Sequence, residues 1–229
     1  MPKISIVIPV YNERKFIKAA LEKIIALDID KEIIVVDDAS CDGTENILEE
    51  LAKSLDFKIV RHLENRGKGA AILSGLKEAK GILFLVFDAD PEYRAEDVLL
   101  LLGEMEKYEN GQVAIYGSRF LGGYKNKFSI HYFANKFLTF LANFLFGLKL
   151  TDMETCLKLC STEIFKKLNL QAQGFEFEPE ITAKLAKNQI KIVEVPISYE
   201  RRSHKQGKKI RAGDGLIAIK TLFKEFLAS

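Results

Sequence analysis

Three acidic residues after one apolar run have the types and spacing that bind a divalent cation. Asp88-Ala-Asp90 directly follows the wholly apolar residues 82–87, and Glu92 comes two residues later. Carboxylates at positions i and i+2 can converge on one Mg²⁺ or Mn²⁺ ion, which prefers oxygen ligands and often bridges carboxylates to substrate phosphates. A structural alternative is that Asp90, before Pro91, initiates a turn while Asp88 caps the following segment.

A second acidic pair, Asp37-Asp38, ends another apolar run. Two adjacent acids repel each other, and a ligand rich in hydrogen-bond donors, such as a nucleobase with its ribose, would offset that cost. The alternative is an N-cap for a helix that begins near Thr44. Tyr11 and Glu13 follow the first apolar run and can supply a stacking face and a hydroxyl acceptor.

Arg66-Gly-Lys-Gly69 stands before an amphipathic stretch. Free N–H groups at a helix start, with Arg and Lys beside them, suit a phosphate group. Ile72 stands where the last glycine of a dinucleotide-binding fingerprint belongs, so neither that motif nor a P-loop is present. A phosphate contact and a plain turn both remain open for this segment.

The elements that position these residues follow from apolar runs that alternate with amphipathic stretches. Continuous apolar strands separated by helices predict an α/β fold with a parallel sheet covered on both faces. In such sheets ligands bind beyond the carboxyl ends of the strands, where the acidic segments stand. Strands are expected at residues 4–8, 32–36, 57–60, 82–87, 113–116 and 156–159, with one or two more across 190–199. Helices are expected at residues 14–27, 44–55, 69–79, 95–108, 178–187 and 215–227.

Residues 119–151 contain no Asp or Glu, and they hold seven of the 16 Phe residues. Phe133, Phe137 and Phe144 belong to a series at helical spacing, which predicts surface helices over 128–148 that lie in a membrane interface. No stretch approaches the ~18 consecutive apolar residues of a membrane span. The alternative is that these Phe residues pack on the sheet or across a dimer interface.

The carboxy-terminal part combines a basic segment with an amphipathic stretch. Residues 201–211 carry six Lys or Arg and no acid, and residues 215–227 place Leu216, Ile219, Phe223 and Phe226 on one side. The whole chain has a net charge of only +2, so no global basic field indicates nucleic-acid binding. Three cysteines, an odd and low number, fit a reducing compartment such as the cytoplasm.

Four motifs occur in order along the first half: Pro9-Val-Tyr-Asn-Glu13, Val36-Asp-Asp-Ala-Ser40, Asn65-Arg-Gly-Lys-Gly69 and Asp88-Ala-Asp90. Together they resemble glycosyltransferase family 2. Further motifs, among them Gly117-Ser-Arg119 and residues 151–158, 174–178 and 207–210, are similar to the branch of dolichyl- and polyprenyl-phosphate hexose synthases.

The resemblance implies a GT-A fold, a mainly parallel sheet sandwiched by helices, with amphipathic interface helices and a basic carboxy-terminal segment. We expect one domain over residues 1–229. Within it, residues 119–150 form the amphipathic acceptor and interface segment. Residues 200–229 form the basic loop and the last helix.

The resemblance also implies roles for individual residues. Asp90 and Arg119 are catalytic, and Asp152 is a further catalytic candidate for the case of a hydroxyl acceptor. Metal ligands, for Mg²⁺ or Mn²⁺, are Asp88, Asp90 and Glu92. Arg119, Arg202 and Lys209 face the acceptor phosphate. The nucleotide-sugar donor is bound by Pro9, Tyr11, Glu13, Asp37, Asp38, Lys68 and Asp88.

The implied reaction transfers a hexose, with inversion, from a nucleotide sugar of the GDP-mannose or UDP-glucose type to a polyprenyl or dolichyl phosphate. Loss of a nucleoside diphosphate leaves negative charge that a metal ion and Lys or Arg neutralise. A phosphate acceptor is already an anion and needs no general base. The enzyme is expected to be peripheral on the cytoplasmic face of the membrane.

Two other functions remain open. A saccharide hydroxyl as acceptor needs a carboxylate base, for which Asp152 is the candidate. The structural alternative for Asp152 is a cap or a salt bridge. The chain can also be a non-catalytic module that binds nucleotide sugars or anionic lipids, although such a module has no need of the metal-binding acids.

Overall fold

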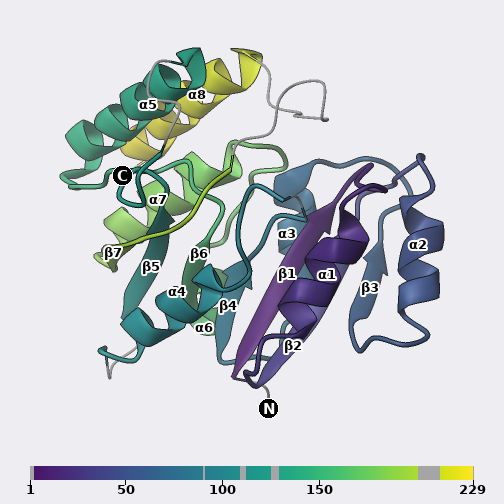
Figure 1. Cartoon of the computed structure of the whole chain (residues 1–229). Helices are drawn as coiled ribbons and strands as arrows, with labels where there is room; N and C mark the ends of the chain where they lie inside the picture. Colours follow the sequence, from purple (N-terminus) through teal and green to yellow (C-terminus); the bar gives the residue numbers. More distant parts are fainter. Residues whose placement is uncertain (1–2, 90, 109–111, 125–128, 201–211, 229) are drawn as a thin grey trace.

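The computed structural model describes residues 3–89, 91–108, 112–124, 129–200 and 212–228, and a seven-stranded sheet forms its centre (Figure 1). The strand order is β3-β2-β1-β4-β6-β5-β7. The strands are β1 (Ile4–Val10), β2 (Lys31–Asp37), β3 (Lys58–Arg61), β4 (Leu83–Val86), β5 (Val113–Ser118), β6 (Lys158–Ser161) and β7 (Lys191–Pro196). The expected mainly parallel sheet is confirmed.

Strand β6 is the exception to the parallel arrangement. It runs antiparallel to both of its neighbours, β4 and β5. The chain reaches β6 from the edge of the sheet where the parallel strands end, because Lys158 at its start pairs with Tyr116 near the end of β5. It therefore runs back toward the start of β4, where Ser161 pairs with Leu83.

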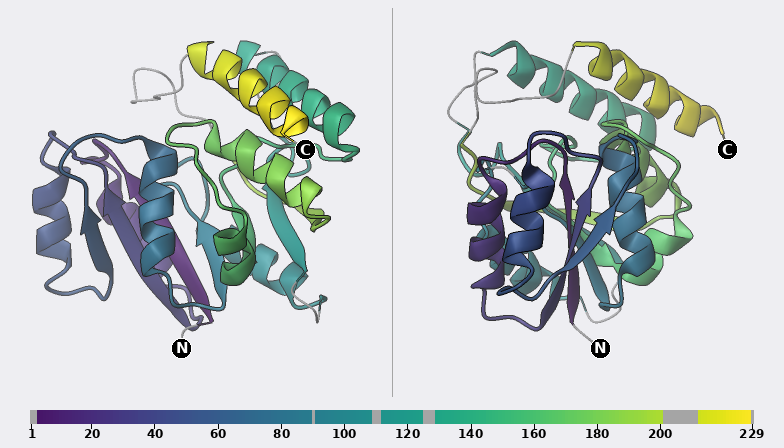
Figure 2. Two further views of the ribbon diagram at one scale, coloured as in Figure 1. Left: turned by 180° about the vertical axis from the view of Figure 1, so that it is seen from behind. Right: turned by 90° about the vertical axis from the view of Figure 1, so that its right-hand side faces the viewer.

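Helices cover both faces of the sheet, as the apolar strands predicted. In Figure 1, α1 and α4 lie in front of the sheet, and Figure 2 shows α3, α6 and α7 on the opposite face. All four residues of β4 are buried, as expected for a strand covered on both sides. The helices are α1 (Ile17–Ile25), α2 (Thr44–Leu51), α3 (Lys68–Glu78), α4 (Asp97–Met105), α5 (Ile130–Phe146), α6 (Thr162–Lys167), α7 (Phe177–Lys187) and α8 (Ala212–Leu227).

Helices α5 and α8 lie side by side beyond the carboxyl ends of the strands (Figures 1 and 2). One helix occupies the range 128–148 for which surface helices were expected, and it starts after Ser129, whose Oγ accepts a hydrogen bond from the Tyr132 amide. Five buried residues hold this layer together in a second small core: Leu138, Ala142, Met153, Ala218 and Leu222. None of the helices that the structure describes is long and apolar enough to cross a bilayer.

Candidate active site

The parallel strands bring the acidic segments to one edge of the sheet. Strand β1 lies between β2 and β4, and Val10 pairs in register with Asp37 while Val7 pairs with Val86. The residues that follow β1, β2 and β4 are therefore neighbours in space. The sequence predicted this gathering of Asp37, Asp38 and Asp88 from the positions of the strand ends alone.

The carboxylate of Asp38 is buried and accepts three hydrogen bonds from the protein itself. His62 Nδ1 lies 2.6 Å from Oδ1, and the backbone amides of Arg66 and Gly67 donate to the two oxygens at 2.9 and 2.7 Å. Asp38 thereby fixes the loop that leads into α3. The nucleobase contact predicted for Asp38 stays a prediction, and the structure adds this positioning role to it.

His62 continues the network away from Asp38. Its Nε2 lies 2.8 Å from Ser74 Oγ on α3, so the ring bridges the end of β2 to that helix. Asp37 makes a local contact instead, since its Oδ1 accepts from the Ser40 amide at 3.1 Å. The alternative in which Asp37 or Asp38 caps α2 is not what the structure shows, because Asp42 Oδ1 accepts from the Thr44 amide at 3.0 Å.

The remaining residues expected at the donor lie around the end of β1. Pro9 pairs in register with Val36 inside the sheet. Tyr11 is half-buried just after the strand, and Glu13 is buried with its amide donating to Thr44 Oγ1 at 3.1 Å. All three lie at the edge where the donor was predicted to bind.

The glycines at the start of α3 allow a second backbone to approach closely. A Cβ atom on Gly69 would stand 2.4 Å from the carbonyl oxygen of Ala172, and Gly67 adopts a φ of +94°, which favours glycine. The amide of Ala70 donates to the Gln173 carbonyl at 2.9 Å. This segment therefore packs against residues 172–174, independently of any ligand that Lys68 contacts.

Four charged side chains of alternating sign form a row of ion pairs next to the end of β4, in the order Asp88, Lys68, Glu178 and Lys158. Lys68 Nζ lies 2.9 Å from Asp88 Oδ1 and 3.4 Å from Glu178 Oε1. Glu178 also pairs with the buried Lys158, whose Nζ donates to the Met153 carbonyl at 2.9 Å. Burial disfavours the charged amine of Lys68, but the attraction of Asp88 and Glu178 outweighs it and holds the pKa of Lys68 well above its usual value.

The carboxylate of Asp88 fits the metal-binding role in its chemistry and its place. It offers hard oxygen donors at the end of a buried strand. It already stabilises one positive charge, the ammonium group of Lys68. Asp90 lies outside the described residues. Glu92 is buried, and its Oε2 accepts a hydrogen bond from the Tyr199 hydroxyl at 2.7 Å. Within the described ranges, no three His, Cys, Asp or Glu side chains form a metal-binding group.

Arg119 and Asp152, two residues predicted to be catalytic, form a buried salt bridge. Arg119 Nε donates to Oδ2 and Nη2 to Oδ1, both at 2.7 Å, and the Arg119 amide donates to Oδ2 at 3.0 Å. The Arg119 guanidinium carbon lies 5.2 Å from the centroid of the Tyr199 ring. The structure therefore shows the salt bridge that was the alternative reading of Asp152.

Glu154 is a site residue that the sequence did not single out, although it lies within the motif of residues 151–158. Burial, reinforced by the negative charge of Glu178, raises the pKa of Glu154 to about 7, and the opposing charges of Lys158 and Arg119 only partly offset this. Its Oε1 is buried and has no hydrogen-bond partner among the described residues. Arg202 and Lys209, expected at the acceptor phosphate, lie outside the described residues.

The mostly parallel sheet covered by helices, with polar residues at the strand ends, is a GT-A fold. A family model for glycosyl transferase family 2 matches residues 5–169, and the chain belongs to that family.

Among solved structures, glucosyl-3-phosphoglycerate synthase from Mycobacterium tuberculosis, in complex with Mn²⁺, UDP and glucosyl-3-phosphoglycerate, shares the fold. Its TM-score is 0.71 at 20% identity, over 100% of this chain and 81% of that one. A mannosyltransferase from Pyrobaculum calidifontis in complex with GDP-mannose and Mn²⁺ has a TM-score of 0.62 at 21% identity, over 85% of this chain and 55% of that one.

Two relatives by sequence place the chain beside polyprenyl-phosphate sugar transferases. UDP-N-acetylglucosamine–dolichyl-phosphate N-acetylglucosaminyltransferase from Methanococcus voltae is 29% identical, over 92% of this chain and 91% of that protein. Dolichol-phosphate mannosyltransferase from Pyrococcus furiosus is also 29% identical, over 90% of this chain, which spans 59% of that protein.

Proposed function

We propose that this enzyme transfers a hexose from a nucleotide sugar to the phosphate of a polyprenyl or dolichyl phosphate, with inversion at the anomeric carbon. The observation that carries the proposal is the salt bridge between Arg119 and Asp152. A hydroxyl acceptor needs a free carboxylate base, whereas Asp152 already accepts three hydrogen bonds from Arg119. A phosphate acceptor needs no base, and the guanidinium group of Arg119, which Asp152 holds in place, can donate hydrogen bonds to it.

The reaction is a single displacement. An acceptor phosphate oxygen forms a bond to the anomeric carbon, and the bond from that carbon to the donor diphosphate breaks, so the electron pair leaves with the nucleoside diphosphate. Lys68 is held beside Asp88 and can neutralise the departing diphosphate. Arg119 would donate hydrogen bonds to the acceptor phosphate. A Mg²⁺ or Mn²⁺ ion bound by Asp88 and Asp90 would supply further charge neutralisation.

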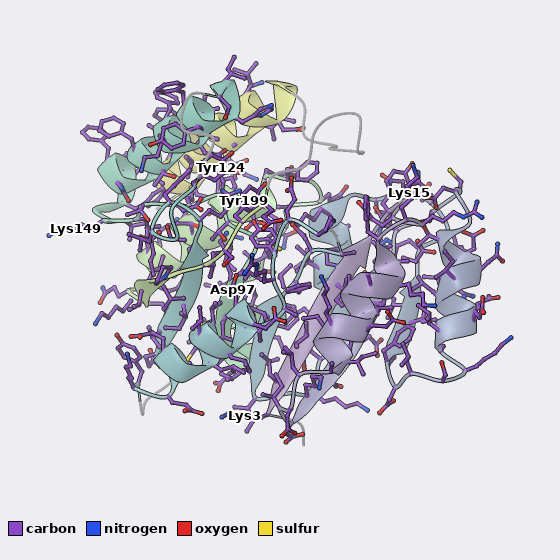
Figure 3. All side chains as sticks on the ribbon, in the orientation of Figure 1. Lys3, Lys15, Asp97, Tyr124, Lys149 and Tyr199 are labelled. Carbon is purple, nitrogen blue, oxygen red and sulfur yellow. The ribbon has the colours of Figure 1, made fainter. Side chains whose placement is uncertain are left out.

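The second part of the proposal concerns the membrane. The outer face of α5 exposes Phe133, Phe137, Phe140 and Phe144, of which Phe144 is 76% exposed. Helix α8 adds exposed Leu216 and Phe223 beside it. Lys149, which follows α5, is exposed and points outward in Figure 3, where it can meet an anionic head group. We propose that this face lies in the membrane interface on the cytoplasmic side and gives the enzyme access to its lipid acceptor.

The test of the activity is a panel of nucleotide sugars incubated with farnesyl phosphate and Mn²⁺, with products read by mass spectrometry. A glycosyl-phosphate product that forms only with metal present supports the proposal. Transfer to a saccharide hydroxyl without transfer to any lipid phosphate would refute it. Donor binding without any transfer would point to the non-catalytic module.

A further inference from the structure

The loop between α5 and β6 carries Asp152, and side chains from other elements hold its backbone. Residues 150–153 form neither helix nor strand, and Asp152 is fully buried between the buried residues Leu150 and Met153. Buried backbone N–H and C=O groups need hydrogen-bond partners, and this loop has no regular ladder to supply them. The side chains that bond to the loop therefore determine where Asp152 lies.

Helix α5 holds the two ends of this loop. Asn143 makes a two-bond contact with Leu150: its Oδ1 accepts from the Leu150 amide at 2.9 Å, and its Nδ2 donates to the Leu150 carbonyl at 2.8 Å. Thr139 Oγ1 accepts from the Met153 amide at 3.1 Å. Thr139 and Asn143 stand four residues apart, so both project from the same side of the helix toward the loop.

Strand β7 and helix α5 together hold the middle of the loop. Glu194 on β7 accepts from the amides of Thr151 and Asp152 at 2.7 and 2.9 Å, and from the Thr151 hydroxyl at 3.1 Å. Lys136 on α5 donates to the Thr151 carbonyl at 3.3 Å. Hydrogen bonds are directional, so these contacts fix the orientation of the loop as well as its place.

Asp152 transmits this position to Arg119. Its two oxygens accept from Nε, Nη2 and the backbone amide of Arg119 at 2.7, 2.7 and 3.0 Å. A bidentate pair fixes the plane of a guanidinium group. A displacement of Asp152 must therefore change the direction in which the other N–H groups of Arg119 point.

We infer that Asn143, Thr139 and Glu194 are positioning residues of the site: they hold residues 150–153 and thereby set the orientation of the Arg119 guanidinium relative to α5. Their effect on sugar transfer rests on the proposed function, in which Arg119 donates to the acceptor. Helix α5 also carries the exposed Phe face that we propose lies in the membrane interface. The loop contacts thus tie the site to that helix.

Hydrogen exchange at Arg119 tests the inference directly. Asn143→Leu removes both bonds to Leu150 and keeps a strong helix former on α5. The readout is the exchange rate of the Arg119 Nε–H, followed by NMR on protein with ¹⁵N-labelled arginine, divided by the rate of the Leu85 amide. Leu85 lies in the fully buried strand β4, so its amide reports global unfolding and the ratio removes any general loss of stability. We expect the ratio to rise roughly tenfold in the variant.

A second variant supplies a conservative rescue and a matched control. Thr139→Val keeps the shape of the side chain and removes the acceptor of the Met153 amide, so it should also raise the exchange ratio. Thr139→Ser keeps the hydroxyl and should restore the wild-type ratio. Thr221→Val makes the same change on α8, where the hydroxyl bonds only within its own helix, to the Ile217 carbonyl at 2.9 Å, and should leave the ratio unchanged. Ratios that stay within about twofold of wild type in both Asn143→Leu and Thr139→Val would overturn the inference.

Steady-state kinetics separate this inference from the proposed function. If Arg119 donates to the acceptor, Asn143→Leu should raise the KM for farnesyl phosphate and leave the KM for the nucleotide sugar unchanged. Faster exchange at Arg119 with an unchanged KM for farnesyl phosphate would support the positioning role and refute the acceptor contact. If wild type transfers no sugar to any lipid phosphate, the proposed function fails and the exchange ratio still decides the inference.

Discussion

The raised pKa of Glu154 makes the stability of the folded enzyme depend on pH. The carboxyl group has a pKa of about 7 in the folded state against an ordinary value of 4.5. Between these two values the folded state keeps a proton that the unfolded state has released. Stability therefore falls as the pH rises through this window, and the whole cost is present above it.

The size of the effect follows from the shift. At about 1.4 kcal/mol for each pKa unit, a rise from 4.5 to about 7 corresponds to a loss of about 3 kcal/mol in the free energy of unfolding. Glu154→Gln keeps the shape of the side chain and cannot ionise. We therefore expect the stability of the variant relative to wild type to increase by about 3 kcal/mol between pH 4.5 and pH 8.

The assay is urea unfolding of wild type and variant at pH 5, 6, 7 and 8, because the difference between the two proteins isolates this group from all others that titrate. Glu163→Gln is the control: Glu163 is exposed on α6 and pairs with Lys167, which lowers the pKa of that carboxyl. Its difference from wild type should stay flat over this range. A difference for Glu154→Gln that is equally flat would refute the argument from burial.

Three further predictions test other residues. Asp38→Ala should lower the free energy of unfolding, measured in urea, by about 2–4 kcal/mol, because the Arg66 and Gly67 amides and the His62 ring lose their acceptor. In steady-state kinetics the same variant should raise the KM for the donor more than it lowers kcat. Asp90→Ala should abolish transfer with folding retained, and activity within about tenfold of wild type, or about 1.4 kcal/mol, would contradict a metal ligand there. Phe137→Ser/Phe144→Ser should abolish flotation with anionic liposomes while circular dichroism stays unchanged, because both rings lie on the exposed face of α5, and folded protein that still floats would favour a dimer-interface role for this face.

The apolar runs predicted most of the fold. Each expected strand and helix is present, with ends displaced by a few residues. The strands were predictable because a strand covered on both faces of a parallel sheet has a continuous apolar sequence. The direction of β6 did not follow from its sequence, since an apolar run has no polarity and only the pairing with β4 and β5 sets it. Helix α6 was missed because its six residues are too few to show a period.

The candidate site was predictable where the chain itself places a residue at a strand end. Asp88 and Asp38 were found by that rule. The partners that complete the site were not, because contacts such as Lys158 with Glu178 and His62 with Asp38 join residues 20 or more positions apart. The stacking of Tyr124 on Tyr199 has the same origin, since these two rings meet only after β5 and β7 have paired.

The position of β6 between β4 and β5 determines the order in which the strands of the sheet can pair during synthesis of the chain. Strand β5 leaves the ribosome before β6, yet it has no neighbour on the β4 side until β6 is in place. At about 5–20 residues per second, the stretch from Val86 to Ser161 takes roughly 4–15 s to emerge. During that interval the nascent chain presents β4, with four apolar residues, as a bare edge that can pair with another chain. Slow translation between β4 and β6 would lengthen this exposure, and we expect it to lower the yield of correctly paired enzyme.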